Sequence, residues 1–316
     1  MGKFSLPTKL VLIFGFLSWL WLGVLGMRFC QLKDYRLPAV FEGANPPLSS
    51  SLWKPQIAGD SFNTQAIDFG QNVAAALSVN FDSGEVYYAL NIHQRLPIAS
   101  LTKVMTALVA LEYASLDKEI TVPAAAMDLP KDSSVMGISA GEVYPVKDLL
   151  YGLLLPSGND AAKTLAIGVL GSEENFVYRM NRRSQSLGLK DTHFGNSSGL
   201  DDPWNYSSVY DLAVLTHYVL VNYPVINQIV GEKQYEIPYT EKHKYLFLGN
   251  FNDLMLLYEG VDGVKPGNTE AAGSCLIASA TRGDRRVMAL VLGSTYRNAA
   301  AIKLLDLGFS VLPSPG

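Results

Sequence analysis

Cysteine is scarce in this chain, whose 316 residues include only Cys30 and Cys275. Small secreted proteins that cannot build a large core rely on several disulfides, and two cysteines in different sequence contexts cannot supply such a framework. Cys275 lies in a run typical of a core strand. Cys30 follows Met27-Arg28-Phe29, which is not the small-residue approach that lipoprotein processing needs. The sequence therefore indicates neither a disulfide scaffold nor a lipid-modified cysteine.

Histidine and clustered positive charge are also scarce. The four histidines, His93, His193, His217 and His243, are scattered without metal-ligand spacing or a paired glutamate, so we expect no metal and no cofactor. The formal net charge is −4, and no long run of Lys or Arg is present. Proteins that bind nucleic acids usually carry a basic track for the phosphates, so nucleic acid is not an expected partner.

One long uncharged run is present, at residues 10–27. As a helix, these 18 positions would extend about 27 Å, close to the roughly 30 Å hydrocarbon core of a bilayer. Lys3 and Lys9 precede the run, which places the N-terminus in the cytoplasm. Since no small-residue cleavage pattern follows Gly26, we expect residues 1–27 to be an uncleaved membrane anchor rather than a signal peptide.

The remaining sequence divides into a stalk and one large domain. Residues 28–69 contain several prolines, a serine run and little periodicity, as in a flexible stalk. Residues 70–316 show no further break. Two β-hairpins are predicted near the ends of this domain, with strands at 74–80, 85–90, 273–281 and 285–293. Helical patterns lie between them, at 100–114, 146–155, 159–170, 173–187 and 207–221. This order predicts an antiparallel sheet with an inserted helical subdomain.

A serine and a lysine share the first turn of the first predicted helix. Ser100 precedes the apolar series, and an N-cap would explain a serine there. Lys103 is three positions later, so its amine lies on the same helix face as the Ser100 hydroxyl. It is also the only charged residue between Ser100 and Glu112. A buried lysine with a lowered pKa can take a proton from a serine, so the pair predicts an activated nucleophile.

Two later motifs add polar groups that could line the same cleft. In Leu153-Leu154-Leu155-Pro156-Ser157-Gly158-Asn159, Pro and Gly interrupt one helix before the next begins, and such joints project side chains outward. Ser157 could relay protons, and Asn159 could bind a substrate amide. In Gly260-Val261-Asp262-Gly263-Val264-Lys265-Pro266-Gly267, the glycines allow a ligand backbone to approach a strand. Lys265 offers a positive charge to a substrate carboxylate.

The ordered motifs Ser-x-x-Lys, Ser-x-Asn and Lys-x-Gly resemble those of penicillin-binding proteins and serine β-lactamases. The flanking segments PIASLTKVMTALVALE, DLLYGLLLPSGNDAA and GVDGVKPGNTEAAGSCLIASA are similar to the D-alanyl-D-alanine carboxypeptidase family of low-molecular-weight penicillin-binding proteins. The similarity covers roughly residues 70–310. It implies the penicillin-binding transpeptidase-like fold of the α/β (α+β) class, in which the active site lies between the sheet and the helical subdomain.

The resemblance also implies roles for individual residues. Ser100 would be the acylated nucleophile and Lys103 its base, with Ser157 and Asn159 completing the catalytic set. The backbone N–H groups of Ser100 and Asn268 would form an oxyanion hole. The residues that would bind substrate are Lys265, Gly267, Asn268, Thr269 and Arg297. The substrate would be a peptidoglycan stem peptide ending in D-Ala-D-Ala, and β-lactams would be covalent inhibitors. The domain would lie outside the bacterial cell membrane on its single N-terminal span.

Two departures keep alternatives open. Pro266 replaces the usual Thr of Lys-Thr-Gly, which removes a hydroxyl and a backbone donor. A catalytically weak or silent peptidoglycan-binding or penicillin-binding protein is therefore one alternative. A β-lactamase-like hydrolase is another, although no Glu-x-x-Leu-Asn pattern follows residue 160. Members of this family often carry a β-rich domain and an amphipathic anchor after the catalytic domain, and we expect the N-terminal span to replace that anchor here.

Overall fold

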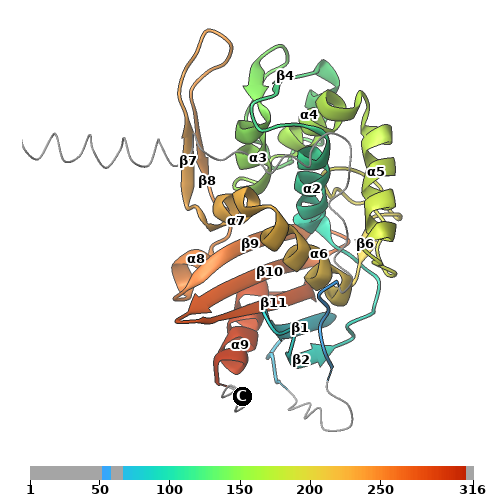
Figure 1. Ribbon diagram of the computed structural model, residues 1–316, viewed down its shortest axis with the longest axis vertical. Helices are drawn as coiled ribbons and strands as arrows, with labels where there is room; N and C mark the ends of the chain where they lie inside the picture. Colours follow the sequence, from blue (N-terminus) through green and yellow to red (C-terminus); the bar gives the residue numbers. More distant parts are fainter. Residues whose placement is uncertain (1–51, 58–66, 311–316) are drawn as a thin grey trace, which may run out of the picture. The chain divides into compact units, whose positions relative to one another are not determined.

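The computed structural model describes residues 52–57 and 67–310 (Figure 1). The expected membrane anchor at 10–27, Cys30 and most of the expected stalk lie outside these residues. Within them, no single helix is both long and apolar enough to cross a bilayer. One pair of consecutive helices, Val209–Asn222 and Pro224–Gly231, reaches the necessary length and composition together but is bent by 105°.

The two predicted hairpins meet in one antiparallel sheet of five strands, in the order β2-β1-β11-β10-β9. β1 pairs with β11, so the beginning and the end of the domain lie side by side. Gly283, at φ +62°, occupies the tight turn between β10 and β11, which form the second predicted hairpin. The strands are β1 (Ala75–Asn80), β2 (Val86–Leu90), β9 (Val261–Thr269), β10 (Gly273–Arg282) and β11 (Arg285–Ser294).

The C-terminal helix α9 (Arg297–Ser310) covers one face of this sheet (Figure 1). Side chains alternate between the two faces of a strand. In β11, Val287, Ala289 and Val291 belong to the fully buried cluster that also contains Ala301 and Leu305 of α9. Small residues on this face allow the helix to pack closely against the strands. The sheet therefore has a core on the side of α9 as well as on the side of the inserted helices.

The segment between β2 and β9 forms the helical subdomain. Its helices are α2 (Lys103–Tyr113), α3 (Val146–Leu154), α4 (Asn159–Leu170), α5 (Glu173–Ser186), α6 (Val209–Asn222), α7 (Pro224–Gly231) and α8 (Leu254–Leu257), with 3-10 turns at Ala99–Thr102 and Ala124–Met127. Short strand pairs accompany them: β3 (Leu96–Pro97) with β6 (Tyr206–Ser207), β4 (Glu119–Thr121) with β5 (Val143–Pro145), and β7 (Gln234–Ile237) with β8 (Leu246–Gly249). The predicted fold class, an antiparallel sheet with an inserted helical subdomain, is confirmed.

Local sequence signals fix several helix ends. The Ser172 side chain accepts a hydrogen bond from Asn175 N at the start of α5, and Ser208 accepts one from Asp211 N at the start of α6. Gly171 ends α4 in the left-handed region at φ +81°. These signals explain why the predicted helices agree with the observed ones to within a few residues. The prediction missed α7, α8, α9 and the short strand pairs β3–β6, β4–β5 and β7–β8.

Residues 52–57 pack against the domain, although the sequence suggested that they belong to the stalk. The Trp53 ring stacks on His217 of α6, with centroids 4.2 Å apart and planes 5° from parallel. Gln56 N donates to Gly84 O at 2.7 Å, and Val86 N donates to Gln56 O at 3.3 Å. This segment is therefore fixed to the β1–β2 hairpin and to α6. The division at residue 69 between stalk and domain stays a prediction.

Candidate active site

Ser100 lies in the 3-10 turn that leads directly into α2, and its hydroxyl faces Lys103 rather than capping the helix. No side-chain cap is present at the start of this turn or of α2. Lys103 Nζ lies 2.9 Å from Ser100 Oγ. The Lys103 side chain is fully buried, with 0% of its surface exposed. A fully buried amine in contact with a serine hydroxyl is the arrangement that a serine–lysine pair needs for proton transfer.

The joint between α3 and α4 carries Ser157 and Asn159, and Asn159 contacts Lys103 of this pair. Asn159 Oδ1 lies 2.7 Å from Lys103 Nζ, and both Ser157 and Asn159 are 5% exposed. Ser157 has φ +61°, a conformation that residues other than glycine rarely adopt and that is found more often at functional sites. The interruption by Pro and Gly, which the sequence showed, thus turns the Asn159 side chain toward α2.

Strand β9 forms the opposite wall. A Cβ atom on Gly267 would lie 3.0 Å from Ser100 N and 3.1 Å from Ala99 Cβ, so only glycine allows the strand to approach this closely. Lys265 is two positions earlier and fully buried, and its Nζ donates to Pro266 O at 3.2 Å. Pro266 lies in the edge strand of the five-stranded sheet, where a missing backbone donor is tolerated.

Arg297, the first residue of α9, also reaches this wall. Its NH1 group donates to Gly267 O at 3.3 Å. Asn268 and Thr269 are placed differently, at the end of β9. Asn268 Oδ1 accepts a hydrogen bond from Ser274 Oγ at 3.2 Å, and Thr269 Oγ1 accepts one from Ala272 N at 3.1 Å. The side chains of these two residues therefore contribute to the connection between β9 and β10.

Burial lowers the pKa of both lysines. For Lys103, burial is the largest cause, the positive charge of Lys265 lowers the pKa further, and Asp160 opposes both effects. The pKa of Lys103 lies well below its usual value. Burial and then Arg297 lower the pKa of Lys265 to about 7. Near neutral pH, Lys103 can thus be an uncharged base while Lys265 is still partly protonated.

Two structural contributions to the site were not predicted from the sequence. The backbone carbonyl of Ser198 lies 2.6 Å from Lys103 Nζ, and a backbone oxygen gives no residue-type signal. Asp160, 2% exposed, accepts hydrogen bonds from the backbone N–H groups of Met136, Gly137 and Ile138. It thereby ties the loop before α3 to the start of α4. A charged residue next to Asn159 was the only available signal for this role.

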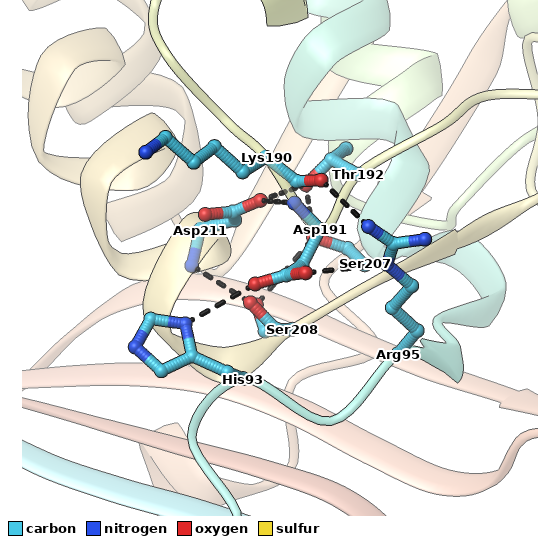
Figure 2. A network of polar contacts seen from close by, with 8 residues as sticks. All are labelled: His93, Arg95, Lys190, Asp191, Thr192, Ser207, Ser208 and Asp211. Atoms are coloured by element: carbon cyan, nitrogen blue, oxygen red, sulfur yellow. Dashed lines mark hydrogen bonds and ion pairs between the residues drawn. The ribbon is translucent and has the colours of Figure 1, made fainter.

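A second polar network supports the segment that leads to Ser100 (Figure 2). Asp191 accepts hydrogen bonds from Arg95 Nε at 3.2 Å and lies 3.1 Å from His93 Nδ1. The backbone N–H of Asp191 donates to Asp211 of α6 at 2.7 Å. These contacts connect the residues before β3 to α6. Within 52–57 and 67–310, no cluster of three or more His, Cys, Asp or Glu residues could hold a metal ion.

A family model and several known proteins are similar to this chain. The family model described as D-alanyl-D-alanine carboxypeptidase matches residues 63–295. D-alanyl-D-alanine carboxypeptidase DacF of Bacillus subtilis is 37% identical over 251 residues, which are 77% of this chain and 64% of that protein. DacD of Escherichia coli is 39% identical over 246 residues, which are 73% of this chain and 61% of that protein. The chain thus spans less than two thirds of the length of these two relatives.

Solved structures show the same fold. The D-alanyl-D-alanine carboxypeptidase of Mycobacterium tuberculosis has a TM-score of 0.71 and 32% identity, covering 76% of this chain and 92% of that one. The Streptomyces K15 DD-transpeptidase has a TM-score of 0.72 and 32% identity, covering 76% of this chain and 98% of that one. With the family match over most of the described domain, these findings show that the chain belongs to the D-alanyl-D-alanine carboxypeptidase family of peptidases, S11.

Proposed function

We propose that this protein is a serine-type D-Ala-D-Ala carboxypeptidase that removes the terminal D-alanine from peptidoglycan stem peptides. The observation that carries the proposal is the fully buried Lys103 amine 2.9 Å from Ser100 Oγ. The family membership and the names of the relatives support the same activity. The second buried amine, Lys265, and the Arg297 guanidinium supply positive charge for a terminal carboxylate.

In the proposed reaction, uncharged Lys103 takes the proton of Ser100 as Oγ attacks the carbonyl carbon of the penultimate D-alanine. The backbone N–H groups of Ser100 and Asn268 would stabilise the negative charge on the carbonyl oxygen. The C–N bond then breaks, and the leaving D-alanine takes a proton from the site. Water hydrolyses the remaining ester and releases Ser100. Ser157 and Asn159 would carry protons and hold the acyl group.

The place of action belongs to the same proposal. Residues 10–27 would hold the protein in the bacterial cell membrane, with residues 70–316 outside the cytoplasm and the stem peptide as partner. The charge layout around that run, with Lys3 and Lys9 before it, supports this orientation. β-Lactams would acylate Ser100 and block the site. Protease added to intact cells should digest the domain and leave the N-terminus protected if the orientation is right.

The test uses the full chain with fluorescent penicillin and a pentapeptide mimic ending in D-Ala-D-Ala. We expect a covalent adduct that mass spectrometry places on Ser100, and release of D-alanine. Ser100→Ala should abolish both, whereas Ser310→Ala, at an exposed serine of α9, should change neither. Unchanged labelling of Ser100→Ala would refute the assignment. Labelling without D-alanine release would favour a silent penicillin-binding protein, and rapid hydrolysis of the penicillin would favour a β-lactamase-like hydrolase.

A further inference from the structure

Lys103 Nζ has three oxygen neighbours, and the closest is a backbone atom. Ser198 O lies at 2.6 Å, Asn159 Oδ1 at 2.7 Å and Ser100 Oγ at 2.9 Å. Ser198 is 95 positions further along the chain than Lys103 and 1% exposed. The Ser198 carbonyl thus lies closer to the buried amine than the Ser100 hydroxyl does.

The hydrogen-bonding capacity of an uncharged amine explains why this contact matters. An uncharged amine has two N–H groups and one lone pair. The carbonyl oxygens of Asn159 and Ser198 can only accept hydrogen bonds. When each takes one N–H, the lone pair of Nζ is left for the proton of the Ser100 hydroxyl. Without Ser198 O, the amine could instead donate its free N–H to Ser100 Oγ, and in that orientation it could not remove the serine proton.

The turn at residues 196–199 is built to hold that carbonyl in place. Asn196 Oδ1 accepts hydrogen bonds from Gly199 N at 2.7 Å and Ser198 N at 3.2 Å, and Asn196 Nδ2 donates to Leu200 O at 3.0 Å. Gly199 has φ +87°, and a Cβ atom there would lie 2.0 Å from Ala99 O. The turn is therefore closed by one asparagine and pressed against the backbone just before Ser100.

Two helices fix the turn from outside. Thr106 Oγ1 of α2 donates to Ser197 O at 2.6 Å. Glu173 Oε1 of α5 accepts hydrogen bonds from Ser197 N at 3.0 Å and Ser197 Oγ at 2.6 Å. Because Thr106 lies one helical turn after Lys103, the helix that carries the base also holds the carbonyl that orients it.

We propose that the turn at 196–199 is a positioning element, in which the Ser198 carbonyl fixes the orientation of the Lys103 amine so that its lone pair faces the Ser100 hydroxyl. The inference rests on the proposed function of Ser100 and Lys103 as nucleophile and base. Asn196 acts through the turn and touches neither substrate nor reacting atoms. The charged groups around this amine are Lys265 from β9 and Asp160 from α4, with Arg297 beside Lys265 and Glu173 on the far side of the turn.

The experiment measures penicillin acylation of the full chain against pH for Asn196→Ala. Loss of the asparagine should free the turn and lower the maximal acylation rate about 10- to 100-fold, as expected for a misplaced catalytic group. A carbonyl dipole stabilises an ammonium more than an amine, so its departure should also move the acidic limb of the profile to lower pH, by up to about one unit. A loss of structure alone would lower the rate and leave the limb where it is.

Asn181→Ala is the matched control. Asn181 also closes a loop with its amide, accepting from Phe194 N at 2.9 Å and donating to Phe194 O at 2.8 Å, but neither contact involves the turn at 196–199. The acidic limb of the pH profile for Asn181→Ala should therefore stay where it is in the wild-type chain. An unmoved limb in Asn196→Ala would overturn the proposal. If Asn196→Ala does not fold, Thr106→Val provides the test, because it removes the hydrogen bond to Ser197 O. The acidic limb of its pH profile should shift less, but in the same direction. An unmoved limb in this variant would also overturn the proposal.

Penicillin acylation separates this inference from the proposed function. A wild-type chain that acylates with penicillin but releases no D-alanine would contradict the carboxypeptidase activity, and the effect of Asn196→Ala on acylation would still test the orientation of Lys103. If Ser100→Ala still forms the adduct, the nucleophile is assigned wrongly and the inference fails with it.

Discussion

At the scale of single residues, the site depends on two buried amines that have different tasks. Lys103 contacts the nucleophile, while Lys265 lies on β9 with Arg297 nearby. Each positive charge makes protonation of its neighbour less favourable. Substitutions that remove a positive charge near Lys265 should therefore raise its pKa and shift the pH profile of activity.

Arg297→Gln should extend activity to higher pH. The guanidinium lowers the pKa of Lys265, second only to burial, so its removal should raise that pKa above about 7 and keep Lys265 protonated in more alkaline solution. The lost contact to a terminal carboxylate should raise KM about 10-fold or more, as for other hydrogen bonds to charged groups. The kcat/KM of D-alanine release against pH measures both effects. Arg179→Gln, at an exposed position of α5, is the control, and an unshifted alkaline limb would contradict the role of Arg297.

Pro266→Thr should improve recognition of the peptide. The threonine hydroxyl would add one hydrogen-bond donor beside Lys265, worth about 1 kcal/mol, which corresponds to a roughly fivefold lower KM. Since β9 is an edge strand, the strand should accept the additional backbone N–H without rearrangement. Steady-state kinetics with the pentapeptide mimic measure KM, and Pro130→Thr at an exposed loop position serves as control. An unchanged KM would mean that Pro266 does not limit binding of the carboxylate.

At the scale of elements, the short segment at 52–57 extends the domain toward its N-terminal side. Trp53 stacks on His217, and Phe81 also contacts this histidine, with ring centroids 4.7 Å apart. Burial and then the charge of Arg286 lower the pKa of His217 to about 4. The imidazole is thus uncharged near neutral pH, which suits a ring stacked between aromatic side chains.

Trp53→Ala should lower the free energy of unfolding by about 2 kcal/mol, less than for a fully buried tryptophan because the ring is partly exposed. Chemical denaturation of the full chain measures this change. Lys54→Ala, at the exposed neighbouring position, should have little effect. Equal stability of the Trp53 and Lys54 variants would show that the segment does not contribute to the domain.

At the scale of the whole domain, the inserted helices complete a site that the sheet alone cannot form. α2 connects the active site to the rest of the helical subdomain, because it begins at Lys103 and carries Glu112 near its C-terminal end. Glu112 Oε1 lies 2.8 Å from Arg183 Nε of α5, and these side chains are 5% and 3% exposed. Burial raises the pKa of Glu112, and Arg183 opposes that rise. This ion pair fixes α2 against α5 inside the helical subdomain.

Arg183→Met should destabilise the domain by about 3–5 kcal/mol, because it leaves a buried carboxylate without its partner. The pKa of Glu112 should then rise further above its unfolded value. A group whose folded pKa is raised binds more protons in the folded state, so the loss of stability should shrink as pH falls. Urea denaturation at pH 8 and pH 5 measures this dependence. Glu112→Gln combined with Arg183→Met should recover part of the stability, and Arg179→Met on the surface of α5 should cost little.

Much of this fold could be predicted from sequence patterns. The two hairpins and five of the helices follow from alternation, helical periodicity and turn residues, which are local properties. The helices α7, α8 and α9 and the short strand pairs β3–β6, β4–β5 and β7–β8 were missed. α9 has apolar residues on several sides, and small residues such as Ala300 and Ala301 form its contact with the sheet, so periodicity alone does not mark it clearly.

The order of amino acids specifies which residues could react, because it contains Ser100, Lys103, Asn159 and Lys265 and separates the first two by three positions, on one helix face. The distances between these groups and their burial from water, by contrast, depend on how distant parts of the chain pack together. Lys103 meets Asn159 across 56 positions and Ser198 across 95, and its complete burial comes from all the elements around it. Because burial and neighbouring charges set the pKa of an amine, the base is defined by the folded protein.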